Sequence, residues 1–95
     1  MSAVTGRPTA GARLVVEKAE EGALAVVYRG IVYLPDADVS AEATVTLPGG
    51  ATRVTLGPGG SAELEKAMAA LVRAATKGQV AAGEALPRKI VRWRP

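Results

Sequence analysis

The chain has 95 residues and a formal net charge of +3, and it contains neither cysteine nor histidine. A chain of this length accommodates one hydrophobic core. The missing cysteine excludes disulfides, thiolate nucleophiles and cysteine-ligated zinc, and the missing histidine removes the commonest proton-transfer group near neutral pH. The only aromatic residues are Tyr28, Tyr33 and Trp93, so valine and leucine must build the core.

Charge is distributed unevenly along the chain. Residues 1–65 contain five basic and eight acidic side chains and carry −3, whereas residues 66–95 contain seven basic side chains and Glu84 and carry +6. No stretch has the apolar core of a secretory signal, and no apolar run approaches the ~20 residues of a membrane helix. We therefore expect a cytoplasmic protein that does not enter a membrane and whose C-terminal part favours an acidic partner.

The first residues and the first predicted strand differ in pattern. Residues 1–11 are rich in glycine, proline and small polar side chains without periodicity, which indicates a disordered N-terminal arm. We expect a single α+β domain over residues 12–95. Arg13 to Glu17 alternates apolar and polar side chains, which predicts a strand, and Glu20 to Gly22 predicts the following turn.

The segment from Ala23 to Leu34 is the longest β-rich run. Its apolar residues occur at both parities, which is typical of a central strand covered on both faces. Gly30 interrupts the run, and a glycine inside a strand often marks a bulge. One extra residue at that point would place Tyr28 and Tyr33 on the same face.

Two further strands are predicted before a glycine-rich break. Val39 to Leu47 alternates apolar residues with Ser, Glu and Thr, so this strand should have one buried and one exposed face. Pro48 to Gly50 provides a turn, and Ala51 to Leu56 then completes a hairpin with the preceding strand.

An amphipathic helix is predicted from about Ala62 to Thr76. Ser61 is a suitable N-cap, and the acidic first turn suits the helix dipole. Gly78 is the expected end. The apolar stripe at helical spacing consists of Leu64, Ala67, Met68, Leu71, Val72 and Ala75, and the residues off that stripe include Lys66, Arg73, Thr76 and Lys77.

The segment from Arg88 to Arg94 predicts a fifth strand at a sheet edge, where charged side chains and Pro95 discourage further pairing. The predicted fold is therefore α+β, with a mostly antiparallel four- to five-stranded sheet packed against one amphipathic helix in the order β-β-β-β-α-β.

Basic residues near the C-terminus are the candidate binding residues. Arginines could neutralise phosphates while Trp93, with Tyr28 and Tyr33, stacks on unpaired bases. In the alternative arrangement Trp93 and Val91 pack inward and the arginines line a solvated edge. The candidate partner-binding residues are Arg88, Lys89, Arg92, Trp93, Arg94, Arg73 and Lys77.

The order of four strands followed by a helix resembles, in topology, one repeat of the Pur-type single-stranded nucleic-acid-binding proteins, and this resemblance implies nucleic-acid binding. The charge asymmetry supports a different hypothesis, in which the negative part of one copy meets the positive part of another.

The acidic residues form no acid–base pair, so we expect no enzymatic activity, catalytic residue, cofactor or metal site. The favoured hypothesis is a binding module that associates with itself or a protein partner through a sheet edge and the basic C-terminal segment. Single-stranded nucleic-acid binding by the strand that contains Trp93 is the alternative.

Overall fold

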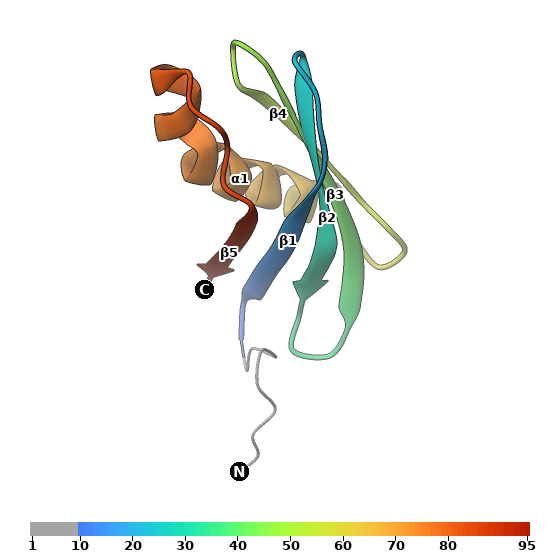
Figure 1. Ribbon diagram of the computed structural model, residues 1–95. Helices are drawn as coiled ribbons and strands as arrows, with labels where there is room; N and C mark the ends of the chain where they lie inside the picture. The colour runs from blue at the N-terminus through green and yellow to red at the C-terminus, as the bar shows by residue number, and fades with distance from the viewer. Residues whose placement is uncertain (1–9) are drawn as a thin grey trace.

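The computed structural model describes residues 10–95 as five strands and one helix (Figure 1). Of the predicted N-terminal arm, residues 1–11, positions 1–9 lie outside the described residues. Within residues 10–95, no helix is both long and apolar enough to cross a membrane. The elements in chain order are β1 (Ala12–Glu21), β2 (Ala25–Tyr33), β3 (Asp38–Thr46), β4 (Ala51–Leu56), α1 (Ala62–Ala82) and β5 (Lys89–Arg94).

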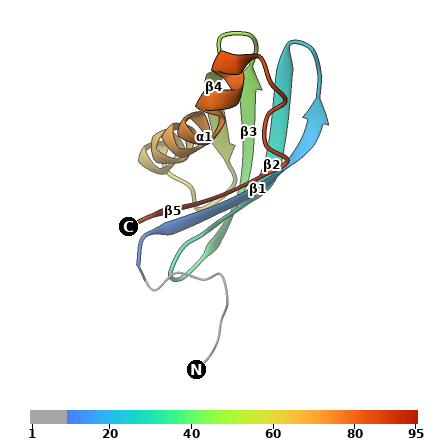
Figure 2. The same ribbon diagram turned by 60° about the vertical axis from the view of Figure 1, so that its left-hand side comes forward.

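The strands form one antiparallel sheet in the order β4-β3-β2-β1-β5. The first four strands are joined as consecutive neighbours, and α1 then crosses one face of the sheet and returns the chain to β5 beside β1 (Figures 1 and 2). This arrangement confirms the predicted α+β fold and its order of elements. It also confirms that the C-terminal strand lies at a sheet edge.

The core lies between α1 and the sheet face that it covers. The alternating residues of β3 point into this layer as predicted, and Met68 and Val72 reach it from α1. Every buried side-chain nitrogen or oxygen among residues 10–95 has a hydrogen-bond partner. The largest side chains that the sheet contributes to this layer are Leu14, Val16, Val26, Tyr28, Val32, Val39, Val45 and Ile90.

The chain between α1 and β5 is fixed by three interactions. Leu86 is buried, the Tyr28 hydroxyl donates a hydrogen bond to the Pro87 carbonyl oxygen, and the Lys18 amide donates to the Arg88 carbonyl oxygen at 2.8 Å. These contacts tie the C-terminal strand to the centre of the sheet through both side-chain and backbone groups.

The helix is longer than predicted, because it continues through Gly78 to Ala82. Glycine inside a helix costs only about 1 kcal/mol relative to alanine, and Val80 packs against the core beyond it. The helix ends at Gly83, whose φ of 67° is left-handed. Thr76, predicted to lie off the apolar stripe, is buried, and its hydroxyl donates to the Val72 carbonyl oxygen at 2.9 Å.

The bulge predicted near Gly30 is also wrong. Pairing continues without interruption through Gly30, and the register shifts in β1 between Lys18 and Glu20 instead. Tyr28 consequently faces α1, whereas Tyr33 lies on the opposite face. Gly30 is required for another reason, because a Cβ at this position would lie 1.9 Å from the Val15 carbonyl oxygen of β1.

Candidate binding surface

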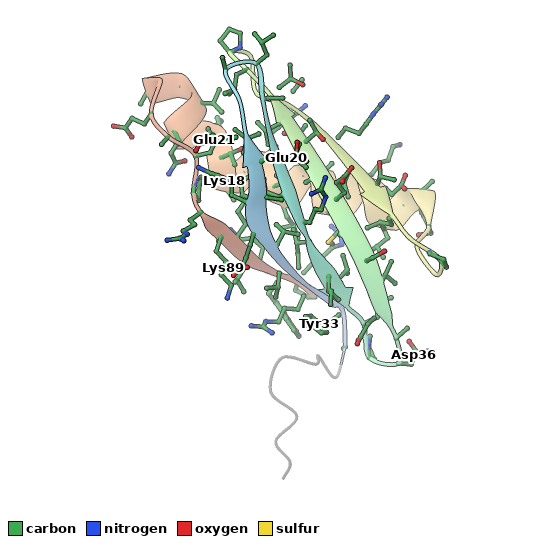
Figure 3. All side chains as sticks on the ribbon, turned by 45° about the vertical axis from the view of Figure 1, so that its right-hand side comes forward. Lys18, Glu20, Glu21, Tyr33, Asp36 and Lys89 are labelled. Carbon is green, nitrogen blue, oxygen red and sulfur yellow. The ribbon has the colours of Figure 1, made fainter. Side chains whose placement is uncertain are left out.

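The sheet face opposite α1 is not covered by any element of residues 10–95, and we call it the uncovered face. Figure 3 views the sheet with α1 behind it. The prediction that the second strand is covered on both faces is therefore wrong for the described chain, because the single helix packs mainly against β4 and covers one face only.

An aliphatic row crosses the middle of the uncovered face. The strand registers place Val91 of β5 opposite Val15 of β1, Val15 opposite Ile31 of β2, and Ile31 opposite Ser40 of β3. Val15 and Ile31 are half-buried by their sheet neighbours alone, and Val91 is 37% exposed. Three β-branched apolar side chains thus form a continuous strip that faces solvent.

An aromatic row lies two residues further along the strands. Trp93 pairs with Arg13, Arg13 pairs with Tyr33, and Tyr33 pairs with Asp38. Trp93 is 51% exposed and Tyr33 is half-buried. The arrangement in which Trp93 and Val91 pack inward is wrong, because Ile90 has the opposite parity and occupies the position beneath α1.

A charged row borders the aliphatic row on its other side. Lys89 pairs with Glu17, Glu17 with Arg29, and Arg29 with Glu42 across β5, β1, β2 and β3. The Lys89 Nζ lies 4.0 Å from Glu17 Oε2, and the Arg29 Nε lies 2.8 Å from Glu42 Oε2. Figure 3 shows Lys89 and, toward the other end of the strands, Tyr33.

The bulge in β1 adds one carboxylate to this network. Because the register shifts after Lys18, Glu20 pairs with Val27 on the uncovered face, and its Oε2 lies 2.9 Å from Arg29 Nη2. The hydrogen bonds from Arg29 to Glu42 and Glu20 raise the pKa of Arg29. The guanidinium is therefore held between two carboxylates.

The seven predicted binding residues do not form one site. Lys89 and Trp93 lie on the uncovered face, whereas Arg92 and Arg94 have the parity of Ile90 and lie on the helix side of β5, where both are exposed. Arg88 precedes β5 and is exposed.

Arg73 and Lys77 lie elsewhere, on α1. They line a groove of about 760 Å³ with the turn from Pro48 to Ala51 and with Val80. No acidic residue lines this groove, so the charges of its lining are all positive, and it contains no nucleophile with a neighbouring base. Within residues 10–95, no three side chains of the metal-binding types gather as a ligand set.

Most residues of the uncovered face were not identified as candidates from the sequence. Arg13, Val15 and Glu17 belong to β1, and Ile31 and Tyr33 belong to β2, and they become neighbours only through the register of the strands. For the two β2 residues, the signal was the occurrence of apolar residues at both parities between Ala23 and Leu34.

Comparison with models of known protein families, with curated protein sequences and with solved structures finds no match to this chain.

Proposed function

We propose that this protein is a non-catalytic binding module that buries the uncovered face of its sheet against another protein surface. The observation that supports the proposal is the exposure of Val91 and Trp93 on the same face as Val15 and Ile31. Contiguous apolar side chains on a sheet face are normally packed, and an exposed patch of this kind is typical of interaction sites. A covering surface would remove all four side chains from water.

The composition of the uncovered face favours a protein over a polyanion. The aliphatic row supplies side chains that pack well between sheets but provide no π surface for a base. Glu17, Glu20 and Glu42 also lie on this face and would repel phosphates at close range. A mixed-charge border around an apolar centre is instead the common anatomy of a protein interface.

Single-stranded nucleic acid is the second candidate ligand, and the aromatic row favours it. Trp93 and Tyr33 flank Arg13, and two rings beside a guanidinium suit base stacking and phosphate contact. Arg92 and Arg94 lie on the other side of β5, so Arg13 and Lys89 are the cations that would accompany Trp93.

Site-specific photo-crosslinking tests the proposal, because it captures a partner whose identity is not yet known. A photoreactive amino acid would replace Val91, on the uncovered face, or Arg92, its neighbour on the helix side, in cells that produce the protein. We expect position 91 to form a discrete protein adduct and position 92 to form none. A nucleic-acid adduct at position 91 would favour the second candidate. Equal yields at both positions would refute the uncovered face as the binding surface.

A further inference from the structure

The charges of the charged row alternate in sign across the sheet. From the β5 edge inward the row contains Lys89, Glu17, Arg29 and Glu42, which is positive, negative, positive and negative. All four side chains are about half exposed or more. If the same row of a second copy is placed over it in reversed order, each charge meets a charge of opposite sign.

Consider a second copy whose uncovered face packs on that of the first. A two-fold axis that lies between the two faces, parallel to the strands and above the gap between β1 and β2, reverses the row. Such an axis exchanges β1 with β2 and β5 with β3, and it keeps each residue at the same level along the strands. Lys89 of one copy then faces Glu42 of the other, and Glu17 faces Arg29. An axis at right angles to the strands along this row would instead place Lys89 on Lys89, so it brings like charges together.

The same axis brings the inner pairs of the other two rows together, and at the ends of these rows it places Val91 over Ser40 and Trp93 over Asp38. In the aliphatic row it places Val15 of one copy over Ile31 of the other, at the centre of the contact. In the aromatic row it places Arg13 over the Tyr33 ring, which is a favourable cation–π arrangement. Aligned packing of two sheets keeps their strands within about 30° of each other, so these pairings hold near the axis.

The sheet edge is a poorer route to self-association. β5 carries Lys89, Arg92 and Arg94, Arg88 precedes it and Pro95 follows it. Pairing two β5 edges would align like charges, and basic residues and proline are features that discourage edge pairing.

We infer that the protein surface that covers the uncovered face is a second copy of this chain, related by the two-fold axis between β1 and β2. This inference rests on the proposed function and names its partner. The contact is isologous, since the same residues contribute from both copies. It is held by the aliphatic row at the centre and by alternating ion pairs beside it.

Complementary charge reversals test the axis. In a Lys89→Glu homodimer each introduced carboxylate faces Glu42 of the other copy, and in a Glu42→Lys homodimer each introduced ammonium group faces Lys89, so both contacts repel. We expect each variant to weaken dimerisation roughly tenfold or more, judged from the strength of exposed ion pairs. A mixture of the two variants restores opposite charges at both contacts. Its heterodimer should regain the wild-type dissociation constant within about threefold.

Sedimentation equilibrium gives the dissociation constants, and native mass spectrometry of the mixture distinguishes heterodimers from homodimers by mass. Arg92→Glu reverses a charge on the helix side of β5, and Glu84→Lys reverses an exposed charge after α1. Both controls should dimerise as the wild type does. Far-UV circular dichroism checks that every variant is folded.

Three results would overturn the inference. A wild-type chain that remains monomeric at ~100 μM would exclude a second copy as the occupant, while a protein adduct at position 91 would still uphold the proposed function. This axis would be excluded if neither charge reversal changed the dissociation constant of the dimer, or if the mixture of the two variants did not regain the wild-type dissociation constant. A monomer whose Trp93 fluorescence is quenched by a single-stranded oligonucleotide, with a salt-dependent affinity, would assign the face to nucleic acid.

Discussion

The hydrogen bond from Tyr28 to Pro87 connects the centre of the sheet with the segment that leads into β5. Tyr28→Phe removes the hydroxyl and keeps the buried ring, so the core packing is retained. A hydrogen bond of this type contributes about 0.5–1.5 kcal/mol net. We expect the free energy of unfolding at pH 8 to fall by an amount in this range.

Ionisation of the Tyr28 phenol also makes the free energy of unfolding depend on pH. Burial, and secondly the negative charge of Glu21, raise the pKa of Tyr28 from 10.0 to about 12. Between these two values the unfolded chain releases a proton that the folded chain retains, so the stability contributed by this group is lost as the pH rises through that window. Between pH 8 and pH 11 we expect ionisation of this group to lower the free energy of unfolding of the wild type by roughly 1–2 kcal/mol. Tyr28→Phe lacks the group and should show no such loss.

Urea denaturation followed by Trp93 fluorescence and circular dichroism, at pH 8, 10 and 11, measures both effects. Tyr33→Phe removes the phenol of the uncovered face and leaves the Pro87 hydrogen bond intact, so its stability at pH 8 should stay within about 0.5 kcal/mol of the wild type. If the wild type and Tyr28→Phe lost stability in parallel between pH 10 and 11, the assignment of this pH dependence to the buried Tyr28 hydroxyl would be refuted.

Three further substitutions, two of them paired with a control substitution, test the fold by urea denaturation. Val72→Asp places a charge at a fully buried position and should unfold the protein, whereas Arg73→Glu, its exposed neighbour, should change stability by less than about 1 kcal/mol; a folded Val72→Asp protein would contradict the helix orientation. Gly30→Ala should destabilise by more than the ~1 kcal/mol typical of a point mutation, because its Cβ would collide with the Val15 carbonyl oxygen, and a neutral result would refute that close approach. Ser61→Ala removes the acceptor of a first-turn amide at 3.0 Å and should cost about 0.5–2 kcal/mol, while Ser61→Asp should cost little.

Features that depend on local sequence were predicted correctly. The two-residue period of β3 identified its buried residues, and Ser61 was identified as the N-cap because capping needs only a suitable side chain at the right position. The order of the elements followed from these local patterns. Together they were sufficient for the fold class.

Several features that depend on contacts between distant segments were not predicted. Gly78 did not end α1 because Val80 packs against the core, and the bulge occurs in β1 rather than at Gly30, where glycine instead permits close approach of β1. The uncovered face was missed for the same reason. Trp93 and Lys89 were identified because basic side chains alternate with the tryptophan in the C-terminal segment, but their neighbours on the face come from strands that are distant in sequence.

The pattern of β2 gives the strongest link between sequence and the proposed function. Its apolar residues occur at both parities, and this predicted packing on both faces. The described chain covers only the face that contains Val26 and Val32, and it leaves Val27 and Ile31 half-buried on the other. An apolar residue contributes to stability when it is removed from water, so covering the part of Val27 and Ile31 that one copy leaves exposed would add to that contribution. A surface from outside the chain, which we propose to be the same face of a second copy, would provide the covering that the pattern of β2 predicted.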